Sequence, residues 1–108
     1  MTLSHLYQLD GEADRILVTC ALPYVNAVPH LGNLVPIVSA DTYARWLRLK
    51  GYRSIYICAT DEHGTRTEIE AAKAGLDEET YCQHLHKRIW EIFRWFNVAF
   101  TQIGRAHV

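Results

Sequence analysis

Two short apolar runs on either side of a helix-patterned stretch constrain the fold of this chain most. Residues 15–21 and 54–59 are apolar and rich in β-branched side chains, a pattern typical of fully buried strands. Residues 31–50 carry apolar side chains at helical spacing, and Gly51 follows as a left-handed cap. A strand, a helix and a second strand joined by a crossover of about 30 residues form a right-handed βαβ unit. The expected fold class is therefore α/β, with a parallel sheet.

The rest of the chain predicts two more helices and one more strand. We expect a short helix at residues 65–74 and a longer one that begins after Asp77, a good N-cap residue. Residues 98–103 have the composition of a third strand. The apolar faces of the two longer helices are expected to consist of Leu34, Ile37, Val38, Ala44 and Leu47 in one and Leu85, Ile89, Ile92, Phe93 and Phe96 in the other. Residues 1–14 are expected to be an N-terminal extension, and residues 15–108 a single partial domain.

Composition excludes several classes of protein. The chain has 108 residues, of which 49% are hydrophobic, so it has enough apolar material for one folded domain. Its net charge of −1 does not suggest a strong nucleic-acid binder. No stretch approaches the ~20 apolar residues of a membrane span, and the polar start is unlike a targeting signal. The expected location is the cytoplasm, away from any membrane.

The cysteines and the paired histidines do not suggest a metal site. Cys20, Cys58 and Cys82 lie far apart with no C-x-x-C pair, and the first two fall inside the predicted apolar strands. We expect buried, reduced thiols there. Cys82 and His86 share a helix face, but two ligands do not make a structural zinc site. The expectation is that this chain holds no metal through its own residues and no zinc.

The turn Pro29-His30-Leu31-Gly32-Asn33 is the strongest candidate for a binding site. It follows a strand and opens a helix, and the first N–H groups of a helix are unpaired and carry partial positive charge. Such a junction favours anions, above all phosphates. His30 adds a donor, and Gly32 leaves room for close approach of a ligand to the backbone. The alternatives are purely structural: His30 only caps the helix, and Asn33 only satisfies hydrogen-bonding groups of its first turn.

Topology is expected to bring distant residues to this turn. In open α/β sheets, ligands bind beyond the carboxyl ends of the strands, and both predicted strands end on the same edge. The expected crevice therefore gathers Tyr24, His30, Asn33, Asp61 and His63.

The side chains of that crevice suggest positioning and electrostatics rather than nucleophilic chemistry. Asp61 is suited to hold an ammonium group, with an ordinary helix N-cap as an equally good explanation. Tyr24 and Leu22 are candidates for the wall of an apolar pocket, or for simple packing. Three roles are possible for His63: it could orient another residue, contact a ligand or fill space in the core. No nucleophile–base pair or pair of catalytic carboxylates is present among them.

Three linked motifs resemble the start of methionyl-tRNA synthetase. They are Val18-Thr19-Cys20-Ala21-Leu22-Pro23-Tyr24-Val25-Asn26, His30-Leu31-Gly32-Asn33 and Cys58-Ala59-Thr60-Asp61-Glu62-His63-Gly64-Thr65. Asn33 in the last place of the second motif is similar to the archaeal and eukaryotic branch of that family, and the end of the last helix fits too. The resemblance implies the amino-terminal part of a class I synthetase catalytic domain, the first half of a doubly wound, Rossmann-like parallel sheet.

The resemblance implies a role for each matching residue. His30, Gly32 and Asn33 would bind ATP, with His30 and Asn33 as catalytic residues; Ala21, Leu22 and Tyr24 would line the methionine pocket, and Asp61 would bind the ammonium group. The family reaction, part of protein biosynthesis, joins methionine and ATP into methionyl-adenylate and then transfers methionine to tRNA(Met), with Mg²⁺.

Other parts of the family pattern do not occur in these 108 residues: the lysine-rich Lys-Met-Ser-Lys-Ser-type loop, the zinc-bearing insertion and the anticodon-binding domain. We therefore expect the first strand to be an open apolar edge that favours self-association, and activity of the chain alone to be absent or low. Two alternatives stay open at this point. One is a stand-alone module that binds nucleotide, methionine or a partner without catalysis, and the other is a small nucleotidyltransferase of the same superfamily.

Overall fold

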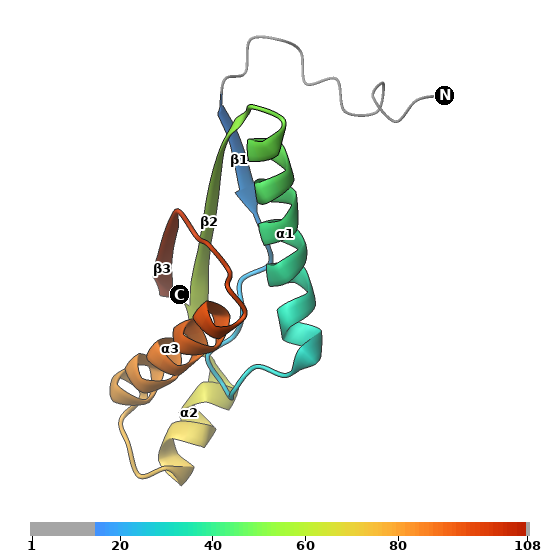
Figure 1. Cartoon of the computed structure of the whole chain (residues 1–108). Coiled ribbons are helices and arrows are strands. Elements are labelled where there is room, and N and C mark those ends of the chain that lie inside the picture. Colours follow the sequence, from blue (N-terminus) through green and yellow to red (C-terminus); the bar gives the residue numbers. More distant parts are fainter. Residues whose placement is uncertain (1–14, 108) are drawn as a thin grey trace.

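The structure is a computed structural model that describes residues 15–107. Three parallel strands form one sheet in the order β1-β2-β3, with three helices in the connections (Figure 1). The elements are β1 (Arg15–Thr19), α1 (Leu31–Leu49), β2 (Arg53–Glu62), α2 (Thr65–Lys73), α3 (Glu78–Trp95) and β3 (Gln102–His107). The α/β class and the parallel sheet are confirmed. The proposed extension, residues 1–14, lies outside the described residues.

The strand boundaries differ from the predicted ones. β1 ends at Thr19, two residues before the predicted end, while β2 continues three residues further, to Glu62. β2 is longer because it is the central strand and pairs on both sides, with β3 through Glu62. β3 begins later than predicted. The segment before it first crosses from α3, and the N–H of Thr101 donates to the carbonyl of Tyr56 over 2.8 Å.

The prediction of two fully buried strands is wrong for one face of the sheet. Side chains alternate between the faces of a strand. In β2, Tyr56 and Cys58 are buried against the helices, while Ile57 between them is 39% exposed. In β1, Val18 is buried but Leu17 is 61% exposed. α1 and α3 both pack on the face that carries Tyr56, whose hydroxyl donates to the carbonyl of Ile37 in α1 over 2.8 Å.

The helices begin and end close to the predicted places. The side chain of Asp77 caps α3 by accepting from the N–H of Thr80 over 3.0 Å, as predicted. At the end of α1, Gly51 has a φ of 92°, and the N–H of Tyr52 returns to the carbonyl of Leu47 over 3.0 Å. That conformation favours glycine, which explains why the helix ends there.

The core lies between the covered face of the sheet and the apolar faces of α1 and α3. Most of the predicted residues are buried in it, but Val38 and Phe96 are partly exposed, at 37% and 42%. Phe100 completes the core by packing on Tyr56 and Phe93, with ring centroids 4.8 Å and 5.8 Å apart. Its buried members are Val18, Val25, Leu34, Ile37, Ala44, Leu47, Tyr56, Cys58, Cys82, Ile89, Phe93 and Val98.

Candidate functional site

The segment after β1 is joined to the end of β2 by a short parallel bridge. The N–H of Asp61 donates to the carbonyl of Pro23 over 2.8 Å, and the N–H of Val25 donates to the carbonyl of Asp61 over 2.9 Å. Tyr24 and Asp61 are therefore direct cross-strand neighbours. The two motifs, almost 40 residues apart in sequence, meet at the carboxyl edge of the sheet, as the βαβ topology predicts.

Besides its bridge to β2, the segment around Val25 is held by α2 and α3. Val25 is fully buried, and its carbonyl accepts from the hydroxyl of Thr67 in α2 over 3.2 Å. The carbonyl of Asn26 accepts from the hydroxyl of Tyr81 in α3 over 2.9 Å. These contacts keep the backbone in place while the side chain of Tyr24 remains 67% exposed. Tyr24 is thus held in position without being packed, which suits a pocket wall better than a core residue.

Asp61 does not serve as a helix cap. The N-cap of α2 is Gly64, three residues later, so the cap explanation for this carboxylate is wrong. The alternation along β2 puts Thr60 and Glu62 on the covered face, where both are fully buried. Asp61 therefore belongs to the open face together with Ile57, and it is only half-buried. A carboxylate at this place is accessible to a cationic group.

His30 and Asn33 form the first turn of α1. His30 is the N-cap residue, and its backbone N–H donates to Oδ1 of Asn33 over 3.1 Å. The first turn carries no acidic side chain, so the positive end of the helix is not neutralised locally. The purely structural explanations, a capping role for His30 and a first-turn hydrogen bond for Asn33, are thus partly correct. His30 nevertheless remains exposed. The start of α1 lies at the same end of the molecule as the carboxyl end of β2 (Figure 1).

A hollow of about 250 Å³ opens beside the bridge. Tyr24 and Asn26 line one side of it, and the turn from His63 to Thr67 lines the other. His63 has a φ of 73°, and its Nδ1 lies 3.0 Å from a carboxylate oxygen of Glu78 at the start of α3. His63 is therefore an oriented residue at the rim of the site rather than a buried filler.

A layer of buried polar pairs lies beneath this edge, and the sequence pattern did not predict it. Nδ1 of His86 lies 2.7 Å from the hydroxyl of Thr60, and the guanidinium of Arg105 binds the buried carboxylate of Glu62 in a two-point contact, one of them 2.9 Å long. Burial lowers the pKa of His86, helped by the nearby charge of Arg105, while the hydrogen bond to Glu62 raises the pKa of Arg105. Thr60 and Glu62 flank Asp61, so these pairs fix the strand on both sides of it.

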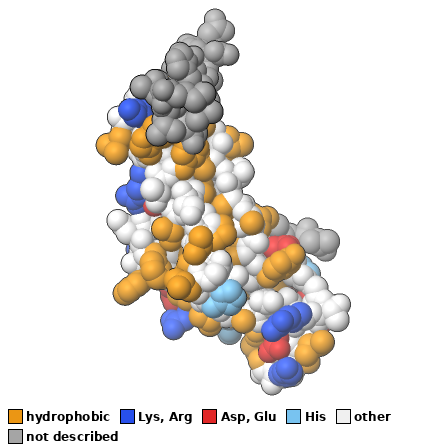
Figure 2. All heavy atoms as spheres, turned by 90° about the vertical axis from the view of Figure 1, so that its right-hand side faces the viewer, with side chains coloured by type: hydrophobic (Ala, Val, Ile, Leu, Met, Phe, Trp, Pro, Cys, Tyr) orange, Lys and Arg blue, Asp and Glu red, His pale blue; other side chains and the backbone are white. Residues whose placement is uncertain are grey.

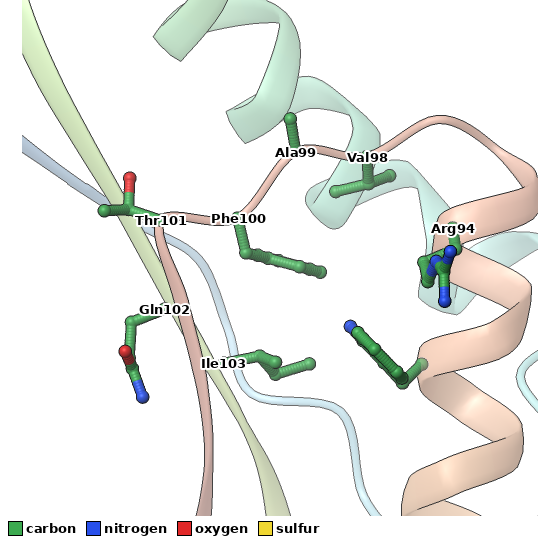
Figure 3. A pocket seen from close by; sticks show the side chains of 8 residues that line it. Arg94, Val98, Ala99, Phe100, Thr101, Gln102 and Ile103 are labelled. Atoms are coloured by element: carbon green, nitrogen blue, oxygen red, sulfur yellow. The ribbon is translucent and has the colours of Figure 1, made fainter.

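Other hollows lie away from this edge. A larger one, of about 390 Å³, lies between α3 and the segment that leads into β3, and is lined by Arg94 on one side and by Val98, Phe100 and Ile103 on the other (Figure 3). An apolar groove of about 300 Å³ follows α1 from Leu31 to Val38, on a face where hydrophobic side chains gather (Figure 2). Within residues 15–107, no three histidine, cysteine or acidic side chains come together as metal ligands.

Comparison with known proteins decides the family. The family model described as tRNA synthetases class I (M) matches residues 16–108. The chain belongs to the class I methionyl-tRNA synthetase family. This match covers both motifs that meet at the Tyr24–Asp61 bridge, and it decides against a small nucleotidyltransferase of another family.

Family members from distant organisms are similar to nearly the whole chain. A probable cytoplasmic methionine–tRNA ligase of Dictyostelium discoideum is 53% identical over 98 residues, which are 90% of this chain and 13% of that protein. A methionine–tRNA ligase of Treponema denticola is 53% identical over 92 residues, 85% of this chain and 12% of its own length. The chain thus spans about one eighth of the length of these relatives.

A solved structure supports the same fold. Mycobacterium tuberculosis methionyl-tRNA synthetase bound by methionyl-adenylate superposes with a TM-score of 0.81 at 30% identity, over 84% of this chain and 18% of that one. The Rossmann-like arrangement expected from the motifs is therefore confirmed. None of the helices in residues 15–107 combines the length and apolar character needed to cross a bilayer.

Proposed function

We propose that this chain supplies the ATP signature and one wall of the methionine pocket of a methionine–tRNA ligase. The observation that carries the proposal is the backbone bridge between Tyr24 and Asp61, which joins the two family motifs. In the family reaction the carboxylate of methionine attacks the α-phosphate of ATP, pyrophosphate leaves, and the methionyl group then passes to tRNA(Met). The bound methionyl-adenylate of the mycobacterial relative supports ATP as the co-substrate.

His30, Gly32 and Asn33 are proposed to bind ATP, with His30 and Asn33 acting during adenylyl transfer. The exposed imidazole and the unneutralised helix start provide donors and positive potential on one side. Negative charge grows on the phosphate oxygens as pyrophosphate leaves, and donors held in place beforehand stabilise that charge. Asn33 contributes by holding the backbone of His30 through the 3.1 Å hydrogen bond.

Ala21, Leu22, Tyr24 and Asp61 are proposed to bind methionine. The first three follow one another after β1 and have exposed side chains, so they can pack on a thioether side chain. Asp61 is the carboxylate nearest to them along the bridge, and it would hold the α-ammonium group by a charge-assisted hydrogen bond.

Further parts of the proposal concern Mg²⁺, tRNA and location. Mg²⁺ prefers phosphate and carboxylate oxygens and is proposed as counter-ion of the ATP phosphates. The described residues do not form a cage of ligands for this ion. tRNA(Met) is the proposed second substrate of the whole enzyme. The cytoplasm is the proposed location, supported by the cytoplasmic relatives of Dictyostelium discoideum and Arabidopsis thaliana.

Calorimetric titration with methionine and with ATP tests the proposal. We expect Asp61→Asn to weaken methionine binding about tenfold or more, and His30→Ala to weaken ATP binding, each with little effect on the other ligand. Asp77→Asn, at a distant helix cap, is the matched control and should change neither. Methionine-dependent exchange of pyrophosphate into ATP should be far below that of a full-length relative. Equal loss of both ligands in either variant would contradict the division of roles.

Self-association through the edge of β1 is also proposed. Among residues 15–107, β1 pairs only with β2, and its other edge has unpaired backbone groups beside the exposed Leu17. Such edges pair readily with another strand. Light scattering over a range of concentrations should show dimers or larger species, and Leu17→Lys should shift the distribution toward monomer. A monomer at every concentration would contradict this part.

A further inference from the structure

Two cysteines face each other across the β1–β2 junction. The sulfurs of Cys20 and Cys58 are 3.6 Å apart. Thr19 is paired with Ile57 in the register of the two strands, so Cys20 and Cys58 are the next residues on each side. Neighbouring strands lie about 4.8 Å apart, which falls within the span between α-carbons that a disulfide requires. Both cysteines are free thiols in this structure.

The surroundings make the two thiols unequal. Cys58 is almost fully buried, whereas Cys20 lies at the end of the strand and is only partly buried. The hydroxyl of Tyr56 lies 3.5 Å from the Cys20 sulfur and itself donates to the carbonyl of Ile37. Hydrogen bonding with the thiol of Cys58 lowers the pKa of Cys20 to about 6, while the same contact and burial raise the pKa of Cys58. Cys20 is therefore the more accessible sulfur of the pair, and the one that an oxidant from solvent reaches first.

We propose that Cys20 and Cys58 form a reversible disulfide when the protein meets a peroxide. The thiol of Cys20 gives up its proton as its sulfur attacks one peroxide oxygen, the O–O bond breaks, and Cys20 becomes a sulfenic acid, while the other oxygen takes up that proton and leaves as water. The Cys58 sulfur then attacks the Cys20 sulfur, and the hydroxide that leaves takes the Cys58 proton and becomes a second water. Two thiols are oxidised and one hydrogen peroxide is reduced to two waters.

Disulfide formation would change the segment that follows Cys20. The sulfurs must approach from 3.6 Å to about 2.05 Å. The pairing of β1 with β2 stops at Thr19, opposite Ile57, and resumes only at Tyr24, opposite Asp61. The segment between Thr19 and Tyr24 contains one more residue than the segment of β2 between Ile57 and Asp61. This bulged segment is the part able to move, and it carries Ala21 and Leu22. On the proposed function, oxidation would therefore weaken methionine binding, and a dithiol would restore it.

Peptide mapping of the whole chain tests the pair without any variant. Cleavage after lysine and arginine leaves the three cysteines on separate peptides, residues 16–45, 54–66 and 74–87. After treatment with hydrogen peroxide and blocking of free thiols, mass spectrometry should find the first two peptides joined, and dithiothreitol should separate them. Alkylatable Cys20 and Cys58 after oxidation, or a bond that involves Cys82, would overturn the proposal.

Variants assign the order of events. Cys82→Ser is the matched control and should keep the cross-link, while Cys20→Ala should abolish it and leave Cys58 reduced. In Cys58→Ala, Cys20 should remain as a sulfenic acid that a cyclic diketone traps; if this buried substitution prevents folding, Cys20→Ala still decides the question. Sulfenic acid on Cys58 in the Cys20→Ala protein would overturn the assigned roles.

Methionine titration of the reduced and oxidised protein separates this inference from the proposed function. Weaker binding after oxidation, reversed by dithiothreitol, supports the link to the pocket. Equal binding in both forms overturns that link. Absence of methionine binding in the reduced protein contradicts the proposed function and removes the link to the pocket, while the peptide map still decides whether the disulfide forms.

Discussion

The imidazole of His30 lies directly over Gly32, two residues further along the chain. A β-carbon at Gly32 would lie 2.9 Å from Cε1 of His30 and 3.1 Å from its Nδ1. The small residue in the His-x-Gly motif therefore makes room for the motif's own histidine. This differs from the expectation that Gly32 only leaves space for a ligand, and it couples the two residues in any test of ATP binding.

Gly32→Ala should separate folding from binding. Alanine favours a helix by up to about 1 kcal/mol over glycine, so the melting temperature should stay the same or rise. The added methyl group must displace the exposed imidazole, so ATP affinity should fall toward that of His30→Ala. Thermal unfolding, ATP titration and the NMR signals of the His30 ring measure the three effects. Ser39→Ala, on an exposed part of the same helix, is the control; unchanged His30 signals in Gly32→Ala would contradict the coupling.

Arg105→Ala should destabilise the chain strongly. It removes the two-point partner of Glu62, whose carboxylate is fully buried, and breaking a buried ion pair by removing one partner costs about 3–5 kcal/mol. Chemical denaturation followed by circular dichroism measures the loss. Arg88→Ala is the matched control, because its pair with Glu91 is exposed and worth about 0–1 kcal/mol. Similar losses in both variants would show that burial of Glu62 has no energetic consequence.

Stability should fall as the pH drops below about 6.5, where an unfolded histidine begins to protonate. Burial lowers the pKa of His86 in the folded state, so the unfolded chain takes up this proton first and is favoured by acid. The contribution is complete above the unfolded pKa and is lost as the pH falls toward the folded one. Denaturation midpoints at several pH values between 7 and 5 measure the loss.

His86→Gln is expected to reduce that slope, and His84→Gln, at an exposed position of the same helix, should not. Equal slopes in His86→Gln and the unmodified chain would assign the acid sensitivity to other groups.

Asp77→Ala should lower stability, because it removes the side chain that accepts from the N–H of Thr80 at the start of α3. Asp77→Asn keeps an acceptor and should lose much less. The carboxylate form is favoured here, since hydrogen bonds from Thr80 lower the pKa of Asp77. A large loss in Asp77→Asn would point to the charge rather than the cap as the source of stability.

Signals between residues close in sequence are enough to predict the helices and the class of fold. Helical spacing, the Asp77 cap and the turn at Gly51 specify α1 and α3 closely, because these signals act between residues a few positions apart. The βαβ rule then brought Tyr24 and Asp61 to one edge, since a right-handed crossover leaves few alternatives. The ends of strands were predicted less well, because they depend on which neighbours a strand finds.

Which faces are buried and which side chains pair depend instead on how the strands and helices pack together. Leu17 and Ile57 are exposed because α1 and α3 pack on the other face of the sheet, and packing brings Cys20 next to Cys58, Thr60 next to His86 and Glu62 next to Arg105. These partners are separated by more than 25 positions in the chain, so no local periodicity reports them. Such contacts form only when strands and helices are packed together, and two of them hold the residues on either side of Asp61, on which the proposed methionine site depends.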